Sequence, residues 1–454
     1  MEKDASYESV VRNTTLGTLV GIRTASGFAF LGVPYARAER FCYAEPVEHW
    51  DGVLDATKIG ASCPQNRAWH PHLENPERLF YYKEYREGIE FHYDEAACLN
   101  CNIYTPHDAD HCPVVVFIHG GGFDSGMNAE APFDGSALAK RGIISVFINY
   151  RVGVLGYLTH EDLKKQYGRD GNFGLDDQLQ AVRWVKSHIA EFGGDPGNIT
   201  LMGQSAGAIS IQYLCLNPHN RGLFLRAVML SGGGLFPKFA LPRKAEDTHA
   251  YWLQFMELAG CSSLDALRSV SCDRLFDAVE AIRAMRKDNT YHTMPVVDGA
   301  LLPASVDELI RSPLPIDYWI GYTNTDMYAP IMAYIGDRFA KQNNGYVYCF
   351  DVDAPGDDNL AFHSADLRYV FGTLSTSWRP YDEQDKAVSD TMLSYLANFV
   401  RCGDPNGEGL PKWTKAHKGI GTKVLRIRRD GIKMACPPYG KMTMNFLRKG
   451  NPKA

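Results

Sequence analysis

The chain has 454 residues, 45% of them hydrophobic, so it is long enough to bury a large core. Its net charge of −6 comes from 47 basic and 53 acidic residues that are spread thinly along the sequence. This distribution provides no basic stripe for nucleic acid and no polybasic segment for an anionic membrane. We therefore expect neither nucleic acid nor a membrane among the partners.

The N-terminal residues 1–9 are acidic and polar, and no basic region there leads into an apolar stretch. No window approaches 18 consecutive apolar residues. Eleven cysteines are scattered without C-x-x-C pairs, which favours neither a zinc site nor a dense disulfide scaffold. These features predict a soluble, cytoplasmic protein without a metal centre, in which most cysteines are reduced and buried.

No Ser/Gly/Pro-rich spacer, internal repeat or run of like charge divides the chain, so we interpret residues 1–454 as one domain. Two stretches differ from the rest. Residues 63–98 are rich in aromatic side chains without a clear period, which is typical of a long surface excursion over a binding site. A loop that merely packs on the body would have the same composition. Residues 242–292 are charged and largely helical, and predict a second excursion.

Near the N-terminus, residues 16–34 alternate apolar and small side chains around a Ser-Gly pair, which predicts an antiparallel hairpin. The apolar run 114–118 predicts a central parallel strand, and His119-Gly-Gly-Gly-Phe123 follows it directly. Three successive glycines let backbone N–H groups point into a cavity. An acyl-transfer site needs such donors where the carbonyl oxygen becomes negative. His119 itself is expected to be structural rather than a proton carrier.

After a helical stretch near 133–141 and a buried strand at 143–148, apolar positions within 175–192 predict an amphipathic helix. Residues 198–208 then read as a strand, a tight turn and a helix, with Ser205 between Gly203 and Gly207. This G-x-S-x-G frame is a nucleophile elbow, in which the turn strains the serine backbone and leaves its hydroxyl protruding.

The rest of the chain continues the alternation of strands and helices, which predicts a mostly parallel sheet covered on both faces. The strongest remaining signals are apolar strand candidates and two helical stretches. The strands are expected at 226–231, 317–321, 346–350 and 423–427, and the helices at 330–341 and 383–400.

Taken together, these motifs resemble the type B carboxylesterase and cholinesterase family of α/β-hydrolases, in its bacterial form. The similarity runs nearly end to end and is far more specific than any one motif. The stretches of this chain that carry the similarity are Phe30–Ala36, Asn102–Pro106, His119–Phe123, Asn149–Gly156, Gly193–Pro196, the elbow, Pro295–Gly299, Phe362-His363 and Phe399–Asn406. The resemblance implies an α/β-hydrolase fold: a central, mostly parallel twisted sheet flanked by helices, with loop and helical excursions over the active site.

The resemblance also implies a catalytic triad in the order nucleophile, acid, base. Ser205 is the nucleophile, and His363 occupies the position of the family's base. The family places a glutamate where this chain has Asp326, so the expected acid is one methylene shorter, and Met327 stands where relatives usually have glycine. Asp298 and Asp366 remain alternatives for the acid.

The oxyanion donors implied by the resemblance are the backbone N–H groups of Gly121, Gly122 and Ala206. Ser231 resembles the serine that helps to hold the acid, and Gln204 replaces the glutamate that many relatives have before the nucleophile. The predicted function is serine carboxylic-ester hydrolysis of small to medium esters through an acyl-enzyme, with no metal or organic cofactor. The alternatives are a catalytically silent binding module on the same fold, and amide or lactone hydrolysis by the same machinery.

Two further expectations concern departures from the family. Cys63 and Cys98 match positions where secreted relatives form a disulfide, but we predict that they are free thiols. Only 37 residues separate Asp326 from His363 (363 − 326 = 37), which leaves no room for the helices that relatives usually insert there. We therefore predict a shallow, open cleft, covered chiefly by the 63–98 and 242–292 excursions.

Overall fold

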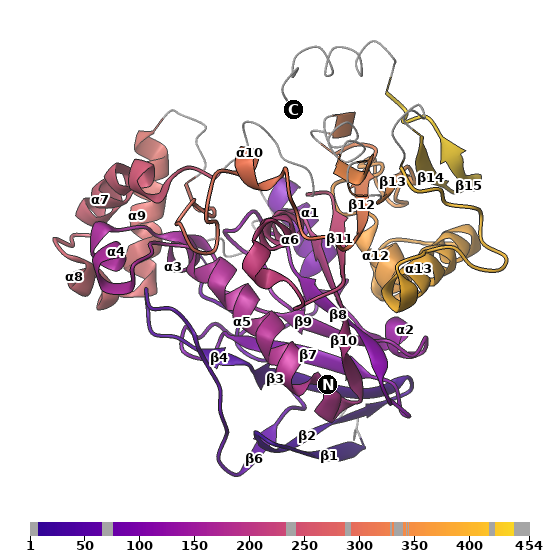
Figure 1. Ribbon diagram of the computed structural model, residues 1–454, viewed down its shortest axis with the longest axis horizontal. Helices are drawn as coiled ribbons and strands as arrows, with labels where there is room; N and C mark the ends of the chain where they lie inside the picture. Colours follow the sequence, from indigo (N-terminus) through magenta and orange to yellow (C-terminus); the bar gives the residue numbers. More distant parts are fainter. Residues whose placement is uncertain are drawn as a thin grey trace.

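A computed structural model describes residues 8–65, 76–232, 242–286, 292–326, 329–330, 339–341, 343, 345–416 and 423–439. Its centre is one 13-stranded sheet that draws strands from both ends of the chain (Figure 1). The expectation of a single domain stays a prediction, which this continuous sheet supports. None of the helices in these described ranges is both long and apolar enough to span a bilayer.

The middle of the sheet is parallel and its two edges are antiparallel. Strands β9, β8, β10, β11, β12, β13 and β14 pair in parallel, whereas β1, β2, β3 and β7 at one edge and β15 at the other pair antiparallel. In sheet order the strands are β1 Ser9–Thr14, β2 Gly17–Thr24, β3 Gly27–Pro34, β7 Asn100–Thr105, β9 Ile144–Ile148, β8 Cys112–Ile118, β10 Gly194–Gln204, β11 Arg226–Leu230, β12 Asp317–Thr323, β13 Tyr346–Phe350, β14 Val424–Arg428 and β15 Gly431–Ala435. Strand β6 (Val53–Asp55) pairs with β2, and β4 (Ala36–Arg37) pairs with β5 (Glu45–Pro46).

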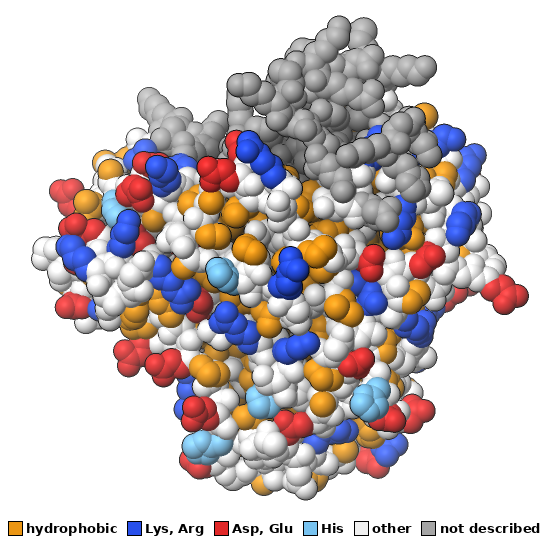
Figure 2. All heavy atoms as spheres, in the orientation of Figure 1, with side chains coloured by type: hydrophobic (Ala, Val, Ile, Leu, Met, Phe, Trp, Pro, Cys, Tyr) orange, Lys and Arg blue, Asp and Glu red, His pale blue; other side chains and the backbone are white. Residues whose placement is uncertain are grey.

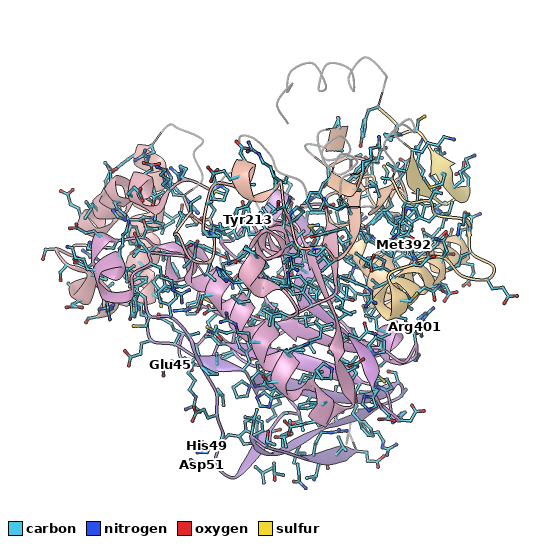
Figure 3. The ribbon with its side chains drawn as sticks, in the orientation of Figure 1. Glu45, His49, Asp51, Tyr213, Met392 and Arg401 are labelled. Atoms are coloured by element: carbon cyan, nitrogen blue, oxygen red, sulfur yellow. The ribbon has the colours of Figure 1, made fainter. Side chains whose placement is uncertain are left out.

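Helices cover both faces of the sheet, which explains why its central strands are apolar throughout. Successive residues of β8 point to opposite faces: Val114 and Val116 pack in the core beneath α5 and α6, and Val115 packs with α12 and α13. Figure 3 marks Tyr213 of α6 and Met392 of α13, both fully buried, in these two layers. The covering helices are α5 (Phe173–His188), α6 (Ala206–Leu216), α12 (Leu367–Phe371) and α13 (Glu383–Cys402).

Most of the remaining helices are short connections between strands or belong to the excursions. The short α-helices are α2 (Ser136–Ala139), α3 (Gly153–Tyr157), α4 (Glu161–Tyr167) and α10 (Val306–Leu309). The 3-10 turns are η1 (Ile189–Phe192), η2 (Pro218–Asn220), η3 (Ala245–Thr248) and η4 (Leu374–Thr376). Side chains of both charges are interspersed with apolar ones on the face in Figure 2.

The two excursions lie in different places. Within 242–292, α7 (His249–Leu258), α8 (Leu264–Arg268) and α9 (Cys272–Met285) form a helical group beside α4 at one side of the molecule (Figure 1). The 63–98 stretch contains α1 (Pro76–Tyr85), which lies behind α6 in the same view.

The predicted α/β architecture is confirmed, with local differences. The hairpin within 16–34 and the strands predicted from 114 onward are present within one to three residues, except that β10 begins earlier, at Gly194. The helix expected at 133–141 is only one turn, α2, and most of the helix expected at 330–341 lies outside the described residues. Strands β1, β7 and β15 and helix α1 were not predicted. The edge strands β1 and β15 carry mixed polar sequence, the internal strand β7 is interrupted by Asn100 and Asn102, and α1 has no clear apolar stripe.

Candidate active site

Ser205 lies in the sharp turn between β10 and α6, at the carboxyl edge of the parallel strands. Its φ of 54° and ψ of −123° are strained for a side chain other than glycine. The turn is held because the Ser205 N–H donates to Leu230 O of β11 at 2.8 Å. A Cβ at Gly203 would lie 2.7 Å from the backbone of Gly207, and one at Gly207 would lie 2.1 Å from Ile118 O. Only glycine allows this approach of strand and helix.

The glycine triplet follows β8, the neighbour of β10 in the sheet. Gly121 and Gly122 have φ of +99° and +63°, and a Cβ at Gly121 would lie 2.0 Å from Ser125 O. His119 is buried, stacks on Tyr150 at 4.3 Å and contacts Gly120 O through Nδ1 at 2.9 Å. Burial lowers the pKa of His119 to about 4, so this imidazole stays neutral.

His363 and Asp326 meet beside the elbow. His363 Nδ1 is hydrogen-bonded to Asp326 Oδ1, and the other carboxylate oxygen accepts from Ser231 Oγ at 2.8 Å and from the Thr323 N–H at 2.9 Å. Burial alone would lower the pKa of His363, but the charge and hydrogen bond of Asp326 outweigh it and raise that pKa above its usual range. The imidazole remains 37% exposed, so a substrate can reach it.

The two alternative acids are engaged elsewhere. Asp298 Oδ1 accepts from the N–H groups of Ala300 and Leu302 at 3.0 and 2.9 Å, in a turn of its own. Asp366 is hydrogen-bonded to the Tyr348 hydroxyl. Burial, reinforced by the charge of Asp326, raises the pKa of Asp366 to about 6, although the Tyr348 hydrogen bond opposes this. Of these carboxylates, Asp326 makes the contact with the base; Met327 lies outside the described residues.

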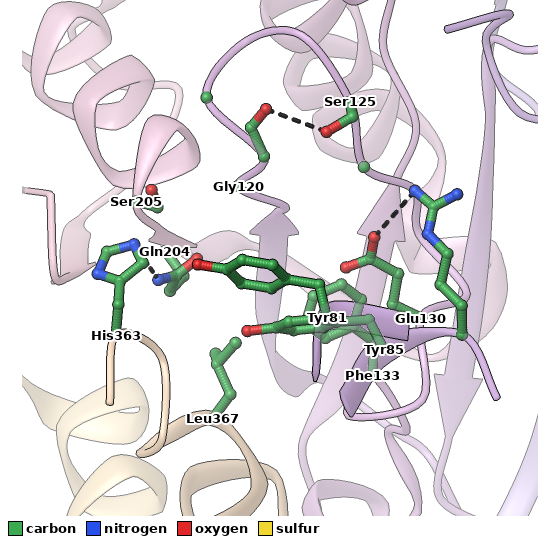
Figure 4. Close-up of a pocket in the computed structure, with 14 residues that line it drawn as sticks. Tyr81, Tyr85, Gly120, Ser125, Glu130, Phe133, Gln204, Ser205, His363 and Leu367 are labelled. Carbon is green, nitrogen blue, oxygen red and sulfur yellow. Dashed lines mark hydrogen bonds and ion pairs between the residues drawn. The ribbon is translucent and has the colours of Figure 1, made fainter. Parts of the chain in front are cut away.

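The other ring nitrogen of His363, Nε2, contacts Gln204, the last residue of β10. Gln204 Nε2 lies 3.1 Å from His363 Nε2, as the dashed line in Figure 4 marks. Within the described chain no hydrogen bond joins Ser205 Oγ to His363, although both residues line the same cavity. Ala206, the third expected oxyanion donor, follows Ser205 as the first residue of α6.

These groups open into one cavity of about 210 Å³ (Figure 4). The glycine triplet, Gln204, Ser205 and His363 form its reactive side, and aromatic and charged side chains form the opposite wall. The wall residues are Tyr81, Tyr85, Arg86, Glu130 and Phe133, and Ser125, Gly126 and Leu367 also line the cavity. The 63–98 excursion thus lines the cavity, as predicted, whereas the described residues of 242–292 do not.

The 242–292 excursion instead supports the glycine loop from outside the cavity. Arg283 of α9 pairs with Asp124, which follows the triplet, at 2.7 Å. The expectation that this excursion covers the cleft is therefore wrong for its described part. Helix α9 packs in the core through its buried apolar residues Leu275, Ala278, Val279 and Ile282, and the Arg283–Asp124 pair adds a contact with the glycine loop.

The wall carries a charged pair that sequence reasoning missed. Arg86 Nη2 lies 3.5 Å from a Glu130 carboxylate oxygen and donates to Gln65 Oε1 at 3.0 Å. Burial raises the pKa of Glu130 to about 7, although Arg86 opposes the shift. Neither residue belongs to a recognisable motif, and only the short distance from Glu130 to the triplet in sequence could have drawn attention to it.

No group of three or more His, Cys, Asp or Glu side chains within the described ranges is placed to hold a metal ion. All eleven cysteines are described and are free. Cys63 and Cys98 are both buried, and the Cys63 thiol, together with burial, raises the pKa of Cys98.

Comparison with known proteins places this site in context. The model of the Carboxylesterase family matches residues 8–344 and 327–447. Pyrethroid hydrolase Ces2e of Rattus norvegicus is 30% identical over 498 aligned residues, covering 89% of this chain and 84% of that protein. Para-nitrobenzyl esterase of Bacillus subtilis is 29% identical, covering 89% of this chain and 92% of that protein.

Solved structures agree with the sequence comparison. A PNB esterase superposes with a TM-score of 0.80 at 26% identity, covering 96% of this chain and 99% of the esterase. The Geobacillus stearothermophilus carboxylesterase EST55 gives a TM-score of 0.78 at 27% identity with the same coverage. The described sheet therefore has the architecture of these α/β-hydrolases.

Proposed function

The chain belongs to the carboxylesterase family and is a carboxylesterase, and from this premise we propose that Ser205, His363 and Asp326 form its catalytic triad. The observation that carries the proposal is the His363–Asp326 hydrogen bond beside a strained serine, within one cavity that the glycine triplet also lines. The substrate is a small-molecule ester. A non-catalytic binding module is disfavoured because no part of this machinery has been lost.

In the proposed reaction His363 Nε2 takes the proton of Ser205 Oγ as that oxygen bonds to the ester carbonyl carbon. Asp326 accepts the Nδ1–H, which fixes the tautomer and stabilises the imidazolium. The carbon–oxygen bond to the alcohol then breaks, and the departing alkoxide receives the proton from His363. Water then attacks the acyl-enzyme while His363 takes its proton. The bond to Ser205 Oγ breaks, His363 returns the proton to that oxygen, and the acid is released.

Negative charge develops on the carbonyl oxygen as each tetrahedral intermediate forms. We assign its stabilisation to the backbone N–H groups of Gly121, Gly122 and Ala206. Donors fixed before the reaction lower the barrier without reorganising, and removing one such donor typically costs on the order of 10²–10³ in kcat. Two observations support this role: both glycines line the cavity, and both have positive φ values.

A panel of 4-nitrophenyl esters of increasing acyl length, with matched 4-nitroanilides, tests the proposal on the wild type and Ser205→Ala. We expect ester hydrolysis by the wild type, little anilide hydrolysis, and loss of ester turnover in the variant. Anilide turnover equal to ester turnover would assign the chain to amide hydrolysis. Unchanged ester turnover in Ser205→Ala would remove Ser205 from the mechanism.

We also propose that the protein works in a reducing compartment, the cytoplasm. The support is chemical: Cys63 and Cys98, at the positions where the resemblance implies a disulfide in secreted relatives, are two free, buried thiols. Thiol titration of the denatured, unreduced protein should find all eleven cysteines reactive. A deficit of two or four thiols would contradict the assignment.

A further inference from the structure

Gln204 contacts the atom of His363 that does the chemistry. Asp326 faces Nδ1, and an ionised carboxylate can only accept, so Nδ1 carries the imidazole hydrogen. The neutral ring then has a single lone pair, on Nε2. Gln204 Nε2 lies 3.1 Å from that atom and is a donor, so the amide N–H occupies the lone pair.

The proposed function needs the same lone pair for the proton of Ser205. One lone pair cannot accept fully from two donors. Ser205 is the next residue in the chain, lines the same cavity and makes no hydrogen bond of its own to the described His363 ring. In the structure, the Nε2 atom of the base therefore contacts Gln204 and not Ser205.

The burial of Gln204 and the space beside Gly120 accommodate the Gln204 amide. Gln204 is buried at the end of β10, and a Cβ at Gly120 would lie 2.6 Å from Gln204 Oε1. The absence of a side chain at Gly120 thus leaves the room that the amide carbonyl occupies. Both ends of the amide are accommodated, one by the glycine triplet and the other by the base.

We propose that Gln204 is a positioning residue that restrains His363 and extends the working range of the base toward acid pH. The inference rests on the proposed function. A hydrogen bond donated to the neutral imidazole favours the neutral form, and it must be broken before Ser205 can be deprotonated. Gln204 therefore lowers the maximal reactivity of Ser205 while it keeps the base unprotonated at lower pH.

The other charged and titratable groups around His363 are the same in the wild type and in variants at residue 204. Asp326 follows β12 and Asp366 begins α12, and both favour the imidazolium. Across the cavity lie Arg86 and Glu130, together with the hydroxyls of Tyr81 and Tyr85. All of them are retained when only residue 204 is changed, so differences between variants at this position report on its own contact.

Two substitutions of Gln204 with side chains of similar size distinguish an effect of its hydrogen bond from an effect of its volume. Gln204→Met fills the same space without a donor, and Gln204→Glu replaces the donor by a negative acceptor. The readout is the pseudo-first-order rate at which a fluorophosphonate labels Ser205, measured from pH 5 to pH 9. Circular dichroism establishes that each variant is folded. This rate reports the availability of the base without any dependence on product release.

For Gln204→Met we expect the plateau labelling rate to rise about two- to tenfold, which corresponds to the net value of one neutral hydrogen bond. The acid limb should move upward by about half a pH unit for the same reason. For Gln204→Glu the acid limb should move upward by at least about one pH unit, because a carboxylate beside the ring stabilises imidazolium.

A plateau rate in Gln204→Met at or below that of the wild type would overturn the proposal, because Gln204 would then only fill space. So would a Gln204→Glu acid limb within about 0.3 pH unit of the wild type. Failure of the proposed function looks different: the wild type itself would not be labelled at Ser205. If only one of the two variants folds, its own expected shift still decides the outcome.

Discussion

The two sides of the cavity are built in different ways. On the reactive side, Ser205, the glycine triplet and Asp326 each follow a strand of the parallel sheet, namely β10, β8 and β12. On the opposite side, Tyr81, Tyr85 and Arg86 belong to the 63–98 excursion. The sheet positions the proposed catalytic groups, and the excursion supplies the facing wall of the cavity.

The excursion is nevertheless firmly attached. Glu84 of α1 is buried and accepts from Arg379 Nε at 2.7 Å and from Trp378 Nε1 at 2.9 Å. Arg368 lies 3.7 Å from its other oxygen. Buried charges need such partners, so the wall depends on a polar network where the reactive side depends on backbone hydrogen bonds of a sheet. Changes on the two sides should therefore have different signatures.

Asp326→Asn tests the reactive side and should have the largest effect. We expect kcat to fall by about 10³–10⁴, because the amide disturbs the tautomer of His363 and removes the charge that supports the imidazolium. The stability of the protein should change little by comparison. Steady-state kinetics with a 4-nitrophenyl ester measures the loss, and Asp298→Asn is the matched control. A loss of less than tenfold would transfer the acid role to another carboxylate.

Glu84→Gln tests the wall and should act on stability. The substitution removes the acidic partner of Arg368 and leaves Arg379 with Asp357 alone. Breaking a buried ion pair typically costs about 3 kcal/mol. Urea denaturation measures the free energy of unfolding, and Glu87→Gln is the control, because Glu87 is an exposed glutamate just beyond α1. If Glu84→Gln costs no more than its control, the network does not anchor α1.

Glu130→Gln tests whether the charge on the wall responds to pH. Burial raises the folded-state pKa of Glu130 to about 7 from an ordinary value of 4.5, so the folded protein binds this proton more tightly than the unfolded chain. The resulting stabilisation is complete below about pH 4.5 and is lost as pH rises to about 7.

Gln cannot titrate, so Glu130→Gln should remove this slope. The difference in unfolding free energy between variant and wild type should change by on the order of 1–3 kcal/mol from pH 4.5 to pH 7, in favour of the variant at the higher pH. Urea denaturation at several pH values measures it. Parallel stability curves for the two proteins would show that Glu130 titrates normally.

The smallest effect is expected from acyl length, which probes the depth of the wall. The short 326–363 connection predicts an open cleft. An open cleft contacts the acyl chain of a substrate along little of its length. A closed pocket gains about 1 kcal/mol or more for each methylene it encloses. We expect kcat/KM for acetyl and butyryl 4-nitrophenyl esters to differ on the order of tenfold. A change above about a hundredfold would show a closed pocket.

The two sides of the cavity also differ in how far the sequence predicts them. The elbow, the glycine triplet and the central strands were predictable because backbone geometry there permits few residue types, such as glycine at 203 and 207. His363 and Asp326 were predicted from the order of the triad residues along the chain and from the resemblance to the family. The structure brings the two side chains together.

The wall was not predictable in this way. Arg86 and Glu130 meet only because two segments far apart in the chain converge, and no local pattern encodes that contact. Helix α1 lacks a clear apolar stripe because its burial relies on Glu84, a charged residue that sequence rules assign to the surface. The Gln204 contact with His363 likewise depends on a side-chain orientation that spacing alone does not give.

The proposed mechanism requires Ser205, the serine of the elbow, to be the nucleophile of this carboxylesterase. Incubation with a fluorophosphonate, proteolysis and mass spectrometry test it most directly, with Ser205→Ala as the control. We expect one modified peptide, the one that contains Ser205, and no modification in the variant. Modification of a different peptide, or an unmodified wild type that still hydrolyses esters, would contradict it.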